Sequence, residues 1–201
     1  RMVGLDPWDA GTPAQVEAAR VQGADLLMLP MFTDAATVRE FAAVVDGRCG
    51  IVPLLETRQA LESLDDWIGS PGVVEVFVGL NDLHLSMGLR FMFEPLALGC
   101  VDRVAAAARA HGLRFGFGGI AQLEGGLLPG RDVLAEHLRL GSRAVILSRS
   151  FAAGPLGLEA GVDVLRRAEV ELAARTPAQI EADRQRIAGR IREIAQGLQV
   201  P

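Results

Sequence analysis

Two carboxylates stand where two neighbouring strands are expected to end. Glu56 directly follows the apolar run 51–55, and Asp82 follows the run 73–79 after a short turn. Because consecutive strands of a parallel sheet are usually neighbours, the two side chains are expected to face one point. Unpaired carboxylates so close together repel each other, and one of them takes up a proton. Mg²⁺ or Mn²⁺ removes this conflict by binding both, so Glu56 and Asp82 are candidate metal ligands.

Both acids also have a purely structural interpretation. Glu56 precedes a predicted helix, where an acid complements the helix dipole, and Asn81 or Asp82 could cap a helix. His84, two residues past Asp82, could be a third ligand, a proton carrier or a structural histidine. Arg149, after the last predicted strand, could clamp a substrate carboxylate or form a structural salt bridge.

The composition excludes several classes of chemistry. All 20 basic residues are arginine, and lysine is absent. Without lysine, the chain cannot form a lysine Schiff base, hold pyridoxal phosphate in the usual way or build a P-loop. The net charge is −5 with no basic patch, which argues against nucleic-acid binding. No apolar run is long enough to span a membrane, and two widely spaced cysteines are typical of a cytoplasmic protein.

Short apolar runs alternate with amphipathic stretches along the first three quarters of the chain. The expected strands are residues 2–5, 26–30, 51–55, 73–79, 114–117 and 144–148, and the expected helices are 13–22, 35–45, 58–68, 101–110 and 132–140. This alternation predicts an α/β fold with a parallel sheet buried on both faces. A closed barrel needs two more strands, whereas an open doubly wound sheet could be complete with these. No G-x-G-x-x-G motif follows a strand, which disfavours a dinucleotide site.

An ordered set of motifs resembles the HpcH/HpaI aldolase and citrate lyase family of the phosphoenolpyruvate/pyruvate-binding superfamily. The motifs are Gly23-Ala24-Asp25 leading to Leu29-Pro30-Met31, then Leu55-Glu56-Thr57-Arg58, Val78-Gly79-Leu80-Asn81-Asp82-Leu83 and Met87-Gly88. The resemblance implies a (β/α)8 TIM barrel of which this chain lacks the first two βα units. It places a partial barrel domain at residues 1–157 and a C-terminal helical extension at residues 158–201.

The same resemblance implies a metal-dependent carbon–carbon lyase of the class II aldolase type. Glu56 and Asp82 would hold Mg²⁺ or Mn²⁺, which stabilises the enolate formed when a 2-oxo acid such as pyruvate separates from an aldehyde. The family's basic histidine would lie upstream of this chain. The other carried-over residues are His84 and Arg149 as catalytic candidates and Arg1, Gly79, Asn81 and Gly119 as substrate-binding candidates.

Two alternatives stay open. One is an acyl-CoA lyase of the citrate or malyl type. The other is a non-catalytic barrel that binds a 2-oxo acid or a metal, which is motivated by Leu54 standing where many aldolases of the family have glutamine.

The C-terminal part differs from the rest in being helical and rich in Arg, Glu and Ala. Ile180, Ile187, Ile191 and Ile194 form one apolar stripe, which could pack on the same chain or on a neighbouring subunit. The resemblance favours a homo-oligomer. In the preceding region, His137 lies in the middle of a predicted helix and is expected at the surface.

Overall fold

A single parallel sheet forms the centre of the molecule. The computed structural model describes residues 1–121, 123–148, 151 and 157–198. Within them the sheet has six strands in the order β1 to β6, and every strand pairs parallel with the next. The strands are β1 (Met2–Gly4), β2 (Leu26–Leu29), β3 (Gly50–Leu55), β4 (Glu75–Val78), β5 (Arg114–Ile120) and β6 (Ala144–Leu147). The six predicted strands and their parallel arrangement are therefore confirmed.

Helices connect the strands and continue beyond the last one. They are α1 (Thr12–Val21), α2 (Ala35–Val45), α3 (Arg58–Glu62), α4 (Leu64–Trp67), α5 (Leu80–Ser86), α6 (Glu94–Ala97), α7 (Cys100–Ala110), α8 (Gly130–Leu140), α10 (Gly157–Ala173) and α11 (Pro177–Gly197). The single helix predicted over 58–68 is wrong, because the helix breaks at Ser63 into α3 and α4. The short turn predicted before Asp82 is also wrong: α5 begins directly after Gly79.

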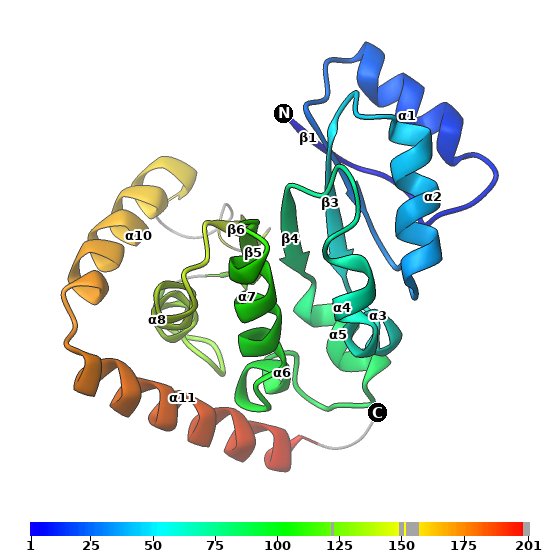
Figure 1. The fold of residues 1–201 in the computed structure, drawn as a ribbon. Helices are drawn as coiled ribbons and strands as arrows, with labels where there is room; N and C mark the ends of the chain where they lie inside the picture. The colour runs from blue at the N-terminus through cyan, green and yellow to red at the C-terminus, as the bar shows by residue number, and fades with distance from the viewer. Residues whose placement is uncertain (122, 149–150, 152–156, 199–201) are drawn as a thin grey trace.

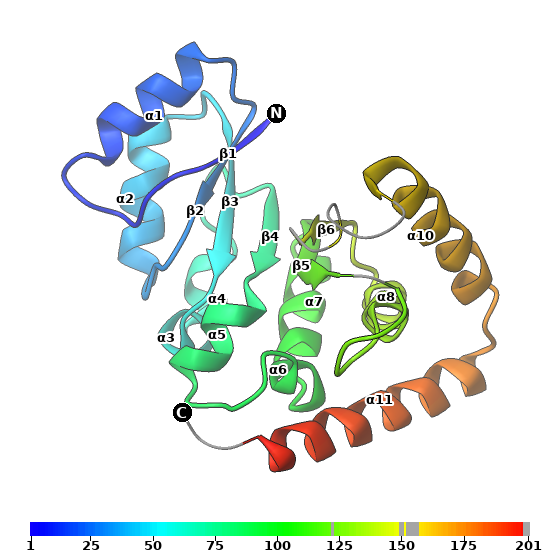
Figure 2. The ribbon, with the colours of Figure 1, turned by 180° about the vertical axis from the view of Figure 1, so that it is seen from behind.

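The two faces of the sheet have different neighbours. Side chains alternate along each strand, so that Ile51 and Val76 join the large core shared with the helices. Their neighbours Val52 and Phe77 pack with Met28 in a small separate cluster that contains strand residues only. The sheet curls, and the helices lie along its outer side (Figures 1 and 2). The arrangement is a curved, parallel half-barrel, and burial on both faces explains why the strands are continuous apolar runs.

The C-terminal helices pack against this chain. Helix α11 runs beneath α8 and α6 (Figure 1), and Ile187 and Ile191 are fully buried there. Arg186 on α11 pairs with Asp132 on α8 at 2.9 Å. The centre of the apolar stripe is therefore covered within the chain, while the predicted homo-oligomer stays a prediction. Among the described helices, none is both long and apolar enough to span a membrane.

His137 is buried, so its predicted surface position is wrong. Its ring stacks on Phe117 with the centroids 3.8 Å apart, and Nδ1 lies 2.8 Å from the Ser142 hydroxyl oxygen. Because that hydroxyl donates to the Ala144 carbonyl, the imidazole is the donor in its bond to Ser142. Burial lowers the pKa of His137 to about 3, so the ring is neutral at ordinary pH.

We expect Gly116→Ala to destabilise the sheet. A Cβ at this position of β5 would lie 2.7 Å from the Ala144 carbonyl oxygen and 2.8 Å from the Phe77 ring. Such overpacking costs about 1–3 kcal/mol, which corresponds to a fall in Tm of roughly 2–12 °C for a chain of this size. Thermal melts should show this fall for Gly116→Ala and little change for Gly4→Ala, where a Cβ meets nothing within 4 Å. Equal melting temperatures for the two variants would contradict the close approach of β5 and β6.

Candidate functional site

Glu56 and Asp82 meet at the carboxyl edge of the sheet. Glu56 directly follows β3, and Asp82 lies in the first turn of α5, which begins just after β4. The two strands are parallel neighbours, so their ends share one edge. The Asp82 carboxyl lies close enough to Glu56 to raise the pKa of Glu56. Glu56 is only 8% exposed, while Asp82 is partly exposed. The structure thus brings together the two acids that the sequence placed at neighbouring strand ends.

Two backbone features hold the Glu56 carboxylate in place. The Met31 N–H donates to Glu56 Oε2 at 3.2 Å. On another side, Gly79 packs directly against the Glu56 side chain, because a Cβ at Gly79 would lie 2.6 Å from Cγ and 2.8 Å from Oε1. Only a glycine leaves room for this carboxylate to stand beside α5.

The surroundings of Glu56 disfavour its charged form. Burial is the main cause that raises the pKa of Glu56, the Met31 N–H bond opposes it and the nearby Asp82 carboxyl adds to it, so that the pKa is about 7. Near neutral pH a positive charge therefore stabilises the pair, and either a proton or a cation can supply this charge. Carboxylate oxygens are the ligands that hard divalent cations prefer, so the pair fits Mg²⁺ or Mn²⁺. Among the described residues, no third His, Cys, Asp or Glu joins them.

His84 does not complete the pair. Successive residues of an α-helix are about 100° apart, so His84 projects from nearly the opposite side of α5 from Asp82. Its ring is buried, and Nδ1 lies 3.2 Å from the Leu80 carbonyl oxygen. The interpretation of His84 as a third ligand or proton carrier is therefore not supported by its position.

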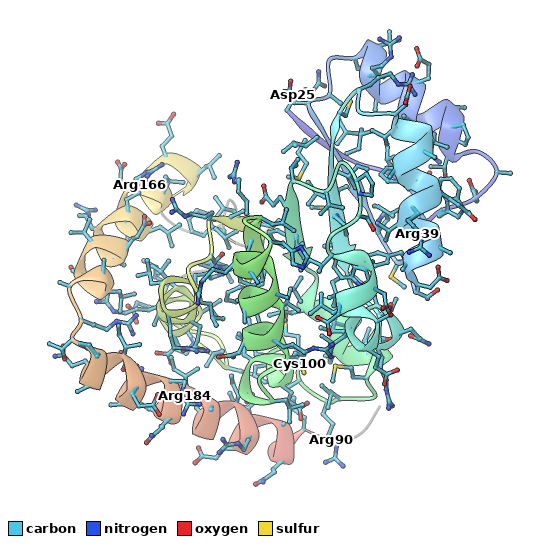
Figure 3. The ribbon with its side chains drawn as sticks, in the orientation of Figure 1. Asp25, Arg39, Arg90, Cys100, Arg166 and Arg184 are labelled. Atoms are coloured by element: carbon cyan, nitrogen blue, oxygen red, sulfur yellow. The ribbon has the colours of Figure 1, made fainter. Side chains whose placement is uncertain are left out.

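Arg1 lies at the wrong edge of the sheet for a substrate ligand. Its terminal amine pairs with Asp25, and its carbonyl oxygen accepts the N–H groups of Asp25 and Leu26, at the start of β2. Figure 3 shows Asp25 at the end of the sheet opposite to α5. The six residues of β3 separate the two edges by about 20 Å. This position does not support Arg1 as the substrate arginine. Arg149, the other candidate arginine, lies outside the described residues.

The three remaining substrate-binding candidates differ in what they can offer. The Gly79 N–H already donates to the Leu55 carbonyl at 3.0 Å, so it is not available to a substrate. Gly119 lies in β5, where a Cβ would be 3.2 Å from the Ile146 carbonyl oxygen, so its absence of a side chain serves the pairing with β6. Asn81 is exposed in the first turn of α5, next to Asp82, and can be reached by a ligand.

Sequence reasoning missed two residues beside the carboxylates. Met31 has a left-handed backbone with φ of 54°, which nothing in the sequence indicates for a methionine. The Thr57 hydroxyl donates to the Phe32 carbonyl at 2.7 Å and accepts the Ala60 N–H at 3.1 Å. Thr57 therefore ties the loop after β2 to the start of α3, and its position just before a predicted helix was a signal for the cap alone.

Comparisons with known proteins find similar structures but no similar sequence. No protein-family model and no curated protein matches the chain. RipC from Yersinia pestis shares the fold at a TM-score of 0.60 and 18% identity, over 89% of this chain and 79% of RipC. The protein CitE from Mycobacterium tuberculosis, in complex with magnesium and acetoacetate, matches at 0.64 and 18%, over 91% and 73% of the two chains. An HpcH/HpaI aldolase from Desulfitobacterium hafniense matches at 0.58 and 20%, over 88% and 73%.

These similarities confirm, at the level of the fold, the resemblance drawn from the sequence motifs. The solved structures that share this fold include HpcH/HpaI aldolases and a citrate lyase beta subunit. At 20% identity or less they establish the architecture, and the chemistry has to be argued from the residues of this chain.

We expect the metal-free protein to lose stability as the pH rises from about 4.5 to 7, through Glu56. Its folded pKa of about 7 exceeds the ordinary value of 4.5, so the folded state holds a proton that the unfolded state has released. Stability is therefore highest below the unfolded pKa and falls by an amount on the order of 1–3 kcal/mol above the folded one.

The measurement is urea unfolding at several pH values in the presence of a chelator. Glu56→Gln should remove this fall, whereas Glu62→Gln, at an exposed carboxylate paired with Arg58, should retain it. The difference between variants isolates Glu56, because His137, with its lowered pKa, gives the opposite trend. Identical pH profiles for the wild type and Glu56→Gln would contradict the buried, proton-holding carboxyl.

Proposed function

We propose that the chain is a metal-dependent carbon–carbon lyase of the HpcH/HpaI aldolase and citrate lyase family. It would cleave or form a 2-oxo acid such as pyruvate, with an aldehyde as the second partner. The observation that supports this most directly is the pairing of the Glu56 and Asp82 carboxyls at the carboxyl edge of a parallel sheet. Functional groups of parallel α/β folds gather at this edge. The half-barrel is, in this proposal, part of a (β/α)8 barrel.

The residues of this chain have distinct roles in the proposed reaction. Glu56 and Asp82 hold Mg²⁺ or Mn²⁺, and the exposed start of α5 at Asn81 meets the substrate carboxylate. A bound divalent ion supplies Lewis-acid stabilisation of enolate charge. With Glu56 and Asp82 as its ligands from the described residues, such an ion would leave ligand positions open for substrate oxygens and water. Arg149 stays a proposed clamp for the substrate carboxylate.

The amino-acid composition is consistent with this route. The alternative way to stabilise the same carbanion is an imine formed on a lysine, and this chain contains no lysine.

The Glu56 carboxylate is oriented before any ligand binds, because a backbone N–H and a glycine contact hold it in place. None of the described side chains beside the pair is assigned as the base that removes the hydroxyl proton of the leaving aldehyde.

A second candidate is an acyl-CoA lyase of the citrate or malyl type. It is favoured by the similarity to CitE, which has also been crystallised with magnesium, acetoacetate and coenzyme A. A non-catalytic barrel that binds a 2-oxo acid and a metal would use the same two carboxylates. The three candidate functions differ in which substrate, if any, the protein converts, so one set of assays distinguishes them.

We expect retro-aldol release of pyruvate from 4-hydroxy-2-oxo acids to depend on a divalent ion and on Asp82. A coupled lactate dehydrogenase assay on the full chain measures the pyruvate. Chelation should abolish activity and Mn²⁺ should restore it. Asp82→Ala should lower kcat/KM by at least 100-fold, on the order of the loss of one electrostatic group in a catalytic site.

Asp65→Ala is the matched control, because Asp65 is an exposed carboxylate on α4 paired with Arg103. Its activity should equal that of the wild type. Pyruvate release untouched by both the chelator and Asp82→Ala would exclude the proposed lyase. Mn²⁺ binding without turnover of any 2-oxo acid would favour the non-catalytic barrel, and turnover of acyl-CoA substrates alone would favour the second candidate.

A further inference from the structure

Met31 has a backbone conformation that residues with a side chain rarely adopt. Its φ of 54° is left-handed, and among the described residues only Asp46 shares this feature without being glycine. Asp46 ends α2, a position and a residue type at which the left-handed conformation is common. Met31 neither ends a helix nor belongs to a residue type that favours this conformation. Its side chain is 44% exposed, so packing of that side chain does not account for the conformation either. Such outliers persist where the surrounding structure imposes them.

The contacts of residues 31 and 32 show what imposes the turn. The Met31 N–H is bonded to Glu56 Oε2, and the next carbonyl, that of Phe32, accepts the Thr57 hydroxyl. The Phe32 ring is buried edge-on against Trp67, with the centroids 4.9 Å apart. Two consecutive residues of the loop after β2 are thus docked on two consecutive residues after β3. A left-handed residue at position 31 lets both contacts form at once.

We propose that Met31 is a positioning residue that acts through its backbone: its left-handed turn keeps the N–H on Glu56 Oε2 and so aims this carboxylate at Asp82 for a shared divalent cation. The inference rests on the proposed function for the identity of the bound ion. The side chain of Met31 has no part in it. Residues that adopt the left-handed conformation easily should therefore be able to replace Met31, and residues that resist this conformation should not.

The test is the affinity for Mn²⁺ of full-length variants at position 31, measured from the free Mn²⁺ signal in electron paramagnetic resonance. Glycine and asparagine adopt positive φ readily, so Met31→Gly and Met31→Asn should bind Mn²⁺ as tightly as the wild type or more tightly. β-Branched valine resists it, so Met31→Val should bind about fivefold more weakly or worse. Asp46→Val is the matched control, because it strains a left-handed position away from Glu56 and should leave the Mn²⁺ affinity unchanged.

A second measurement needs no metal and covers the case in which Met31→Val does not fold. In chelated wild-type protein the Met31 amide should exchange its hydrogen slowly, and Glu56→Ala should accelerate this exchange at least tenfold while distant amides keep their rates. The proposal is overturned if Glu56→Ala leaves the Met31 amide unchanged, if Met31→Gly weakens Mn²⁺ binding, or if folded Met31→Val binds Mn²⁺ like the wild type. Wild-type protein that binds no Mn²⁺ instead overturns the proposed function.

Discussion

A buried carboxyl group facing a second carboxyl group is the constraint on which the rest of this structure depends. Glu56 loses hydration on folding and stands beside Asp82, and both effects raise its pKa, to about 7. A fold retains such an arrangement only where the backbone enforces it, since a surface carboxylate would turn to solvent. Here the enforcement is specific: the N–H of Met31 binds one side of the carboxylate and the missing side chain of Gly79 makes room on another.

The frame around this pair is stiff because it is continuous with the core. Gly79 is hydrogen-bonded to Leu55 in the neighbouring strand, so the start of α5 is held in register with the end of β3. Thr57 joins the loop after β2 to α3, and the Trp67 indole N–H binds the Ala60 carbonyl at 2.8 Å beneath it. Hydrogen bonds thereby connect the carboxyl ends of β2, β3 and β4, and large apolar side chains pack beneath them. Precise placement of reacting groups requires a support of this kind.

Arginine-only composition has a structural use in the outer helices. Arg139 on α8 forms forked bonds to Glu136 in its own helix and to Asp102 on α7. Arg186 makes a similar fork on Asp132 and fastens α11 to α8. A planar guanidinium satisfies two carboxylate oxygens at once, which a lysine ammonium does in a less specific geometry. The same bias that removes imine chemistry from the chain thus supplies contacts that link α7 to α8 and attach α11.

The amino-acid sequence by itself determined the six strands in their order, the longer helices between them and the placement of Glu56 and Asp82 at neighbouring strand ends. These follow from local patterns, since an apolar run marks a buried strand and consecutive strands pair. Tertiary structure alone decided that His84 turns away from the acids, because this depends on α5 being a helix and not a turn. It also decided that Arg1 stands at the far edge and that Met31 is left-handed. These features depend on contacts between segments that are far apart in the sequence, and the spacing of residues along the chain does not specify such contacts.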